Sequence, residues 1–287
     1  PADSGWAARF SAMASPCELL LEGVSESTAG TVADAVAAEA WRIEDKFSRY
    51  LDGNVVHRIN TANGEPVSVD DETARLLDFA ATLHELSDGR FDVTSGVLRE
   101  AWTFDGSDRV PAAADIDKVL ERVGWSRATW NSPMLALPPG MEIDLGGIGK
   151  EYAVDRCIEV LRACCDGPGL VNLGGDLAVT GQPRARNAWR VAVEGDSPEH
   201  ADRLIELRQG ALATSGDARR FLLKDAVRYG HILDPRTGWP VPDAPHSITV
   251  AAVTCTQAGM LSTMAMLKGS EAEAFLREQG VQFWCRR

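Results

Sequence analysis

The segment that most constrains the fold spans residues 141–155 and reads MEIDLGGIGKEYAVD. A short apolar run through Asp144 is followed by Gly146-Gly147 and then by a helical pattern, which predicts a strand, a turn and a helix. Glycines let the backbone approach a bulky anion, and a helix N-terminus offers free N–H groups. The corner suits a phosphate, with Lys150 beside it, although many ordinary turns also carry two glycines to pack a helix on a strand.

Three further blocks place polar side chains among turn-forming residues. LVNLGGDLAVTG, residues 170–181, is an apolar strand broken by Gly174-Gly175, where glycine weakens strand pairing, and Asp176 follows. Two loop-like blocks, ATSGDARRF (213–221) and RYGHILDPRTGWPV (228–241), add Ser215, His231, Asp234, Arg236 and Thr237. Because binding groups concentrate on constrained loops, these blocks predict a functional site.

Taken in order, the blocks resemble the ApbE-type FAD:protein FMN transferase family. The similarity runs through AMASPCELLL (12–21), FSRYLDGNVVHRIN (47–60), FDVTSGVL (91–98), the 144–150 turn, NLGGD, ATSGD, HILDPRTG and CTQAGMLSTMAMLKG (255–269). One block alone is unspecific, but together they cover most of the chain in family order. The resemblance implies an enzyme that splits FAD between its phosphates and attaches FMN to a threonine of a partner protein, or hydrolyses FAD to FMN and AMP.

Carried over by position, the resemblance implies contacts with FAD at Met13, Tyr50, Arg90, Phe91, Asp92, Asp144, Lys150 and Ile232. Asp144 would hold a polar edge of the cofactor and Lys150 its phosphates. His231 matches the histidine of the family's HxxDPxTG block and would position phosphate or the leaving group, or else hold its loop by a hydrogen bond. The catalytic candidates are therefore His231, Asp144 and Lys150. Asp144, Asp176 and His231 are the candidate general bases.

The sequence departs from the family pattern in two places. The family's Met-Gly-Thr is MAS here, residues 13–15, which is a mild change. Its Ala-Asp-x-x-x-Thr, in which the Asp and the Thr bind Mg²⁺, is AGMLST here, residues 258–263, so that Gly259 replaces the metal carboxylate. Since Mg²⁺ prefers anionic oxygen ligands, the substitution predicts a weakened or rearranged metal site.

The remaining candidate metal ligands are the carbonyl of Gly147 and the hydroxyls of Ser262 and Thr263. Waters, the phosphates of FAD, or a carboxylate such as Asp243 or Asp176 could complete the site. The preferred interpretation is an active transferase that uses FAD and Mg²⁺. The alternatives are an FAD-binding carrier, an FAD pyrophosphatase with an impaired metal site, and a structural domain. The family's Ser/Thr-Gly-Ala-Thr acceptor motif does not occur in the chain, which implies a separate acceptor protein.

Composition narrows the class of protein. The net charge of −13 argues against a nucleic-acid partner, and no run of about 18 apolar residues predicts a membrane span. The six cysteines have no zinc-like spacing, so free thiols in a reducing compartment are expected. The opening PADSGWAARF has no signal-peptide pattern. This favours the cytoplasm, or the periplasm if a signal was removed before residue 1.

The 287 residues suit one domain, residues 1–287, or two intimately packed subdomains. Periodicity predicts helices over 28–46, 72–86, 112–123, 148–164, 257–267 and 271–278. Strands are predicted over 11–21, 134–137, 141–145, 170–180, 189–194, 203–207, 221–224, 247–253 and 281–284. Because strands and helices do not alternate strictly, an α+β class with mixed, mostly antiparallel sheets is favoured over a doubly wound sheet. The resemblance implies an ApbE-like, T-fold-related architecture.

Overall fold

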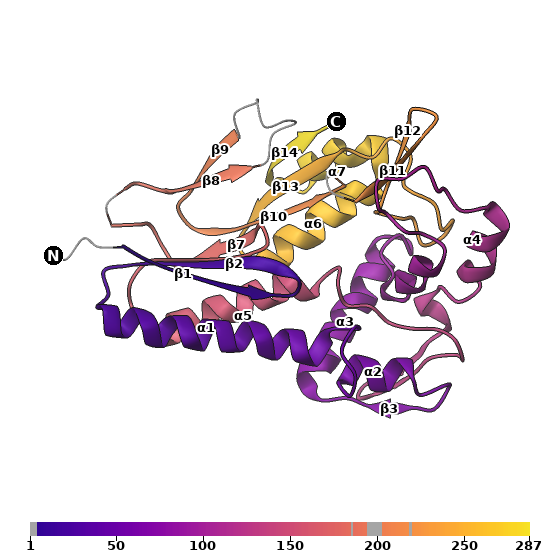
Figure 1. Cartoon of the computed structure of the whole chain (residues 1–287), viewed down its shortest axis with the longest axis horizontal. Helices are drawn as coiled ribbons and strands as arrows, with labels where there is room; N and C mark the ends of the chain where they lie inside the picture. Colours follow the sequence, from indigo (N-terminus) through magenta and orange to yellow (C-terminus); the bar gives the residue numbers. More distant parts are fainter. Residues whose placement is uncertain (1–4, 185, 194–202, 218–219) are drawn as a thin grey trace.

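The computed structural model describes residues 5–184, 186–193, 203–217 and 220–287. Its centre is a seven-stranded sheet in the order β1-β2-β6-β7-β10-β13-β14 (Figure 1). These strands are β1 (Gly5–Ala12), β2 (Ser15–Glu22), β6 (Gly169–Leu173), β7 (Asp176–Val179), β10 (Gly210–Gly216), β13 (Ser247–Ala252) and β14 (Gln282–Arg286). All neighbouring strands of this sheet pair antiparallel, which confirms the predicted α+β class.

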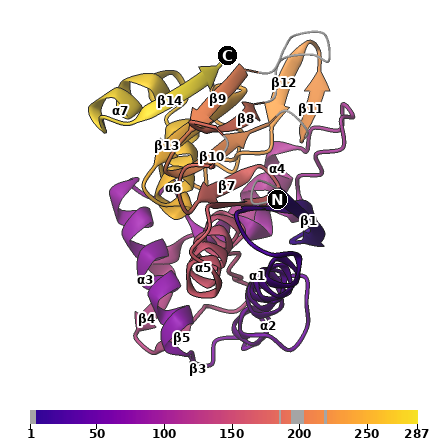
Figure 2. The same ribbon diagram turned by 90° about the vertical axis from the view of Figure 1, so that its left-hand side faces the viewer.

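Three helices cover one face of the sheet: α1 (Glu26–Phe47), α5 (Gly149–Cys164) and α6 (Cys255–Leu267). Figures 1 and 2 show α1 and α5 on the same side of the strands. α5 contacts β6, β7 and α6, while α6 contacts β10 and β13. The predicted helical stripe of α1 is confirmed, because Val32, Val36, Ala40 and Ile43 are buried at helical spacing. Ser25 caps this helix by accepting a hydrogen bond from the N–H of Thr28.

The opposite face of the sheet is covered by the hairpin of β8 (Trp189–Val193) and β9 (Arg203–Leu207). Trp189 and Ile205 of the hairpin join Leu170, Leu177 and Leu212 of the sheet in one buried cluster. The strand predicted over 189–194 ends at Glu194, and this residue lies outside the described residues. The middle of the sheet is thus buried on both faces, and its turns and strand ends are the places left for a site.

The remaining elements gather at one end of the sheet, apart from the last helix, which lies against α6 and β14 (Figures 1 and 2). They are α2 (Val55–Asn60), β3 (Val67–Ser68), α3 (Asp71–Leu86), a 3₁₀ helix (Val93–Glu100), α4 (Ala113–Leu120), a short 3₁₀ turn (Trp125–Arg127), β4 (Thr129–Asn131), β5 (Met134–Ala136), β11 (Phe221–Lys224), β12 (Val227–Gly230), a 3₁₀ turn (Gly269–Glu271) and α7 (Ala272–Glu278). The main hydrophobic core extends from Leu19 and Val171 in the sheet to Leu77 and Leu135 in this part.

Two predicted strands are hairpins. The run 11–21 splits into β1 and β2 because Met13 and Ala14 have positive φ values of 50° and 53° and form a two-residue turn. The run 170–180 splits into β6 and β7 at Gly174 and Gly175, whose φ values of 66° and 106° suit glycine. A period of two continues through a tight turn, so the pattern did not reveal the first break, whereas the two glycines indicated the second.

The predicted strand 141–145 is wrong. Met141, Ile143 and Leu145 are buried in alternation, as in a strand, but the segment pairs with no other strand in the described part of the chain. The N–H of Ile143 donates to the side chain of Asn60, and the N–H of Asp144 donates to the carbonyl of Val93. Ser215 also differs from expectation, because it lies on β10 and not on a loop. Among the described helices, none combines the length and the apolar character that crossing a membrane requires.

Candidate active site

The two Gly-Gly turns and the N-terminal hairpin meet in one corner. A Cβ built on Gly174 would lie 2.7 Å from Cβ and Oγ of Ser15 and 3.8 Å from Cδ of Lys150. The glycine is therefore required by close packing as well as by its positive φ. The prediction that something approaches this backbone closely is confirmed for Ser15, which follows the β1–β2 turn. Three of the family-like blocks thus converge at the start of α5.

Lys150 forms an ion pair with Asp176, with 2.8 Å between Nζ and Oδ2. The other carboxylate oxygen of Asp176 accepts the N–H of Thr214 at 3.1 Å. Burial alone would lower the pKa of Lys150, but the adjacent Asp176 carboxylate outweighs it and the pKa is raised. Lys150 is therefore a fixed cation. Its side chain is 33 % exposed while that of Asp176 is 4 % exposed, so the positive end of the pair faces outward.

Hydroxyl groups from β10 and α6 form a cluster beside this pair. Oγ of Ser215 lies 2.8 Å from Oγ of Ser262 and 2.9 Å from Oγ1 of Thr263. Ser262 also donates to the carbonyl of Gly259 at 3.0 Å. Two of the predicted metal-binding residues, Ser262 and Thr263, thus share a hydrogen-bonded partner. Within the described ranges, no three His, Cys, Asp or Glu side chains are grouped as a metal site.

The space beside Gly259 is filled by a carboxyl group. A Cβ built on Gly259 would overlap Cγ of Glu151 and lie 2.7 Å from its Oε1. Glu151 is 9 % exposed, and its Oε2 is buried with no hydrogen-bond partner among the described residues. Burial, followed by the charge of Asp176, raises the pKa of Glu151. Glu151 was not singled out as a site residue from the sequence.

Asp155 fixes α5 against α6. Its Oδ1 accepts the N–H of Cys255 at 2.7 Å, and its Oδ2 accepts the N–H and the hydroxyl of Thr256 at 2.8 and 2.6 Å. A carboxylate at a helix N-terminus is stabilising because it accepts otherwise unpaired N–H groups. The first turn of α6 is therefore held by α5, one turn beyond Glu151.

Asp144 lies just before the Gly146-Gly147 turn. Its Oδ1 accepts the N–H of Gly146 at 2.8 Å, and its Oδ2 lies 3.2 Å from Nε of Arg49. Arg49 also donates to the hydroxyl of Tyr50 at 2.8 Å, which links two of the predicted cofactor residues. Arg49 was not singled out in the sequence, although it stands in the FSRYL stretch. Tyr50 is 78 % exposed, so its ring is free to contact a ligand.

Gly147 packs on an aromatic ring. A Cβ built on Gly147 would lie 3.3 Å from Cε2 of Phe91. α5 begins at Gly149, within two residues of the predicted start, and its N-cap residue Ile148 makes no side-chain cap. The N–H groups of Ile148 and Gly149 donate to the carbonyl of Leu145 at 3.0 and 2.7 Å. A side chain larger than hydrogen at Gly147 would press on the Phe91 ring.

Arg90 and Asp92, on either side of Phe91, serve the fold in the structure. Arg90 donates to the carbonyl of Leu267, the last residue of α6, at 3.1 Å. Asp92 is buried, and its carboxylate accepts the N–H and hydroxyl of Thr94 at 2.7 and 2.6 Å and the N–H of Trp125 at 2.8 Å. The contact of this stretch with FAD stays a prediction.

Replacing Asp92 by Asn is expected to lower the free energy of unfolding by about 3 kcal/mol, because an amide N–H₂ would face N–H donors in a buried site. Chemical denaturation measures this loss, with the exposed Asp117→Asn as the matched control. Weakened FAD binding at unchanged stability would instead identify Asp92 as a direct cofactor contact.

His231 is partly buried at the start of the DPRTG loop. Its backbone N–H donates to the carbonyl of Arg220 at 3.2 Å. Its ring lies edge-on to that of Phe104, with 6.3 Å between the ring centroids. Burial, followed by the charge of Arg220, lowers the pKa of His231, so the ring is neutral at neutral pH. Its Nδ1 has no hydrogen-bond partner among the described residues. A neutral imidazole with an unoccupied nitrogen is able to accept a proton.

The loop after His231 is anchored by its own side chains. Asp234 pairs with Arg236 at 2.6 Å, and Trp239 packs edge-on against Trp102 with 5.4 Å between centroids. Trp239 therefore anchors the loop through this packing. Ile232, which follows His231 in the sequence, lines a small pocket of about 200 Å³. The same pocket is lined by Asp217, Arg228, Asp243, His246 and Met266.

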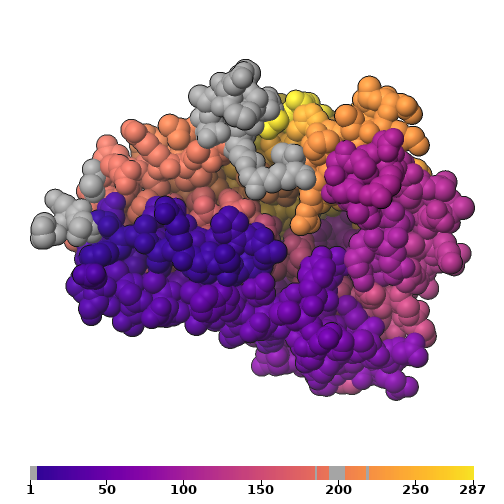
Figure 3. Space-filling view, viewed as in Figure 1, coloured from indigo at the N-terminus to yellow at the C-terminus, as the bar shows by residue number. Residues whose placement is uncertain are grey.

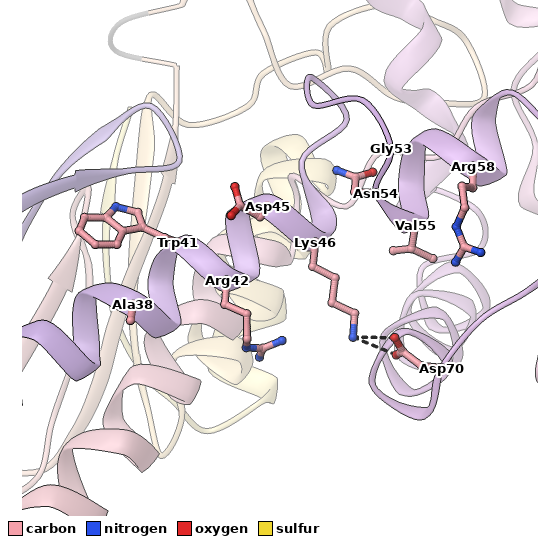
Figure 4. Close-up of a pocket in the computed structure, with 10 residues that line it drawn as sticks. All are labelled: Ala38, Trp41, Arg42, Asp45, Lys46, Gly53, Asn54, Val55, Arg58 and Asp70. Carbon is pink, nitrogen blue, oxygen red and sulfur yellow. Dashed lines mark hydrogen bonds and ion pairs between the residues drawn. The ribbon is translucent and has the colours of Figure 1, made fainter.

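A larger groove of about 710 Å³ lies along the outer side of α1 (Figure 4). None of its lining residues is a predicted site residue, and two of its three cations are already paired. Arg42 pairs with Glu39 and Glu72, and Lys46 pairs with Asp70. The corner at the Gly-Gly turns is the better candidate. Figure 3 shows the surface hollowed beside the indigo N-terminal hairpin, between the magenta and orange parts of the chain.

The chain matches known proteins over most of its length. The model of the ApbE family matches residues 13–284. An FAD:protein FMN transferase of Vibrio cholerae is 31% identical over 257 residues, which are 87% of this chain and 76% of that protein. The FAD:protein FMN transferase of Treponema pallidum is 31% identical over 259 residues, with 81% and 70% covered.

Solved structures share the whole fold. The ApbE protein of Thermotoga maritima is 32% identical, with a TM-score of 0.87 over 98% of this chain and 94% of that one. The apo flavinyl transferase ApbE of Pseudomonas stutzeri is 27% identical, with a TM-score of 0.86 over 99% and 91%. Since sequence and fold both match over nearly the full length, this chain belongs to the ApbE family.

Proposed function

We propose that this chain is an FAD:protein FMN transferase, which cleaves the pyrophosphate of FAD and attaches FMN to a threonine of a separate acceptor protein. One observation carries the proposal: the charged Lys150–Asp176 pair stands between two Gly-Gly turns in a chain whose relatives bear this name. The acceptor would present the Ser/Thr-Gly-Ala-Thr context that the family resemblance implies. Tyr50 and Asp144, linked through Arg49, would contact the flavin-bearing half.

The donor set of the corner fits Mg²⁺, which prefers hard oxygen ligands. The hydroxyls of Ser262 and Thr263, the carbonyl of Gly147 and the phosphates of FAD would hold the ion, and an unpaired carboxylate oxygen of Glu151 is close by. When bound, the ion would neutralise charge on the phosphate oxygens.

The proposed reaction is a displacement at the phosphorus next to riboflavin. The threonine oxygen forms a bond to this phosphorus while the bond from phosphorus to the bridging oxygen breaks, and AMP leaves with that oxygen. Lys150 offers a fixed positive charge for the oxygens that become more negative. The hydroxyl proton passes to a base, for which His231, Asp144 and Asp176 remain the candidates. Asp176 is already engaged by Lys150 and Thr214, and Asp144 by Gly146 and Arg49, which favours His231.

The decisive experiment is AMP release from FAD by the purified protein, with Mg²⁺ or a chelator and with or without a peptide that carries the acceptor motif. We expect release to fall about 100-fold or more in the chelator. We also expect the peptide to gain the mass of FMN. Release without labelling would identify a pyrophosphatase. Tight FAD binding without release would identify a carrier, and no FAD binding would overturn both functions.

A further inference from the structure

Of the carboxyl groups at the start of α5, one has no partner in the described part of the chain. Lys150 is matched by Asp176, and Asp155 is occupied by the first N–H groups of α6. Glu151 lies between these groups in the sequence, and its Oε2 has no hydrogen-bond partner among the described residues. The corner therefore carries an uncompensated carboxyl group in a buried position.

A buried carboxylate oxygen without a partner is costly, because its lost hydration is not replaced. Oε2 of Glu151 is in this state, although its residue is 9 % exposed. Simple filling of space does not account for a carboxyl group here, since an apolar side chain of similar size would fill the same volume at lower cost. A ligand with positive charge would satisfy the oxygen.

The position of the carboxyl group is specific. It occupies the space into which a side chain at residue 259 would project, one helical turn before Thr263 on α6. Thr263 and Ser262 are joined through Ser215, so hydroxyl and carboxyl oxygens approach the same part of α6. Asp176 is engaged elsewhere, and Asp243 lines the pocket at Ile232.

We propose that Glu151 is the carboxylate ligand of the divalent cation, supplied from α5 in place of the side chain that Gly259 lacks. This inference rests on the proposed metal-dependent transfer of FMN. The hydroxyls of α6 and the carboxylate of Glu151 would then bind the same ion. A chain that keeps this carboxyl group at the same point in space retains the anionic oxygen that Mg²⁺ requires.

The test measures Mn²⁺ affinity from the electron paramagnetic resonance signal of the free ion, with FAD present and FAD alone as the blank. Glu151→Gln keeps the volume and removes the charge, and it is expected to weaken Mn²⁺ binding about tenfold or more. The matched control is Glu159→Gln, on the same helix at a side chain that is 61% exposed, which should bind Mn²⁺ as the wild type does. The exchange variant E151A/G259D moves the carboxylate to α6 and should recover most of the affinity.

Equal Mn²⁺ affinity of the wild type and Glu151→Gln would overturn the inference, and so would a wild type that binds no Mn²⁺. AMP release, measured in the same samples with Mg²⁺, separates this outcome from failure of the proposed function. Continued metal-dependent release by Glu151→Gln would leave the transferase standing, whereas a wild type without any release would not. If Glu151→Gln loses its native circular dichroism spectrum, the exchange variant decides, because no recovery of affinity there also contradicts the inference.

Discussion

Replacing Lys150 by methionine is expected to slow AMP release from FAD by about 10²- to 10³-fold, the typical cost of removing one preorganised charge-stabilising donor. The side chain keeps its length, so the loss reports the charge. Nζ is held 2.8 Å from Asp176 and the side chain is partly exposed, which places a cation where the phosphate is proposed to lie. Initial rates at saturating FAD and Mg²⁺ measure the effect.

The substitution also leaves Asp176 as an unpaired buried charge, which costs stability by itself. The double variant K150M/D176N removes both charges, so it should regain stability without regaining activity. Lys224→Met, on an exposed part of β11, is the matched control and should behave as the wild type. Near-normal activity of a folded Lys150→Met protein would show that Lys150 serves only to hold Asp176 in place.

Restoring the family carboxylate by Gly259→Asp alone is expected to damage the protein. The new Cβ would overlap Cγ of Glu151, and two carboxyl groups would then share one buried space. We expect the free energy of unfolding to fall by about 3 kcal/mol, which for a chain of this size lowers Tm by about 5 °C. Thermal unfolding followed by circular dichroism measures the change. Metal-dependent AMP release should not rise.

Gly30 provides the control for this substitution. It lies on α1, and a Cβ built there meets no atom within 4 Å, so Gly30→Asp should change stability by about 0.5 kcal/mol or less. E151A/G259D should be more stable than Gly259→Asp because the overlap is removed. An unchanged Tm for Gly259→Asp would mean that Glu151 moves away freely, and this would contradict the close packing of α5 on α6.

Much of the fold follows from local pattern. The helices at 28–46 and 72–86 are confirmed because each pairs a regular apolar stripe with one buried face. The helix at 257–267 is also confirmed, but it is buried nearly all round. The strand predicted over 141–145 was wrong because burial alternates there as in a strand, although the segment pairs with no other strand in the described part of the chain. The β1–β2 turn was missed because Met13 and Ala14 adopt positive φ without the Asn-Gly or Asp-Gly signal of such turns.

The site was predictable to the extent that it follows from the family blocks. The family assignment is confirmed, and the blocks around Lys150, Asp176 and Ser215 meet as their shared order indicated. The position of Glu151 was not predictable, because it depends on how α5 packs against α6. Arg49 was missed for the same reason, since its partner Asp144 is far away in sequence.

The clamp that Asp155 forms between α5 and α6 has a consequence for how such chains are recognised. With the two helices held in fixed register, a carboxyl group can reach one point in space from either of them. A position-by-position comparison records a lost acidic residue at Gly259, whereas a comparison of occupied volumes records a carboxyl group in place. Screens that discard sequences for lacking the acidic residue on the second helix would reject this chain, and a search that examines both helices together would keep it.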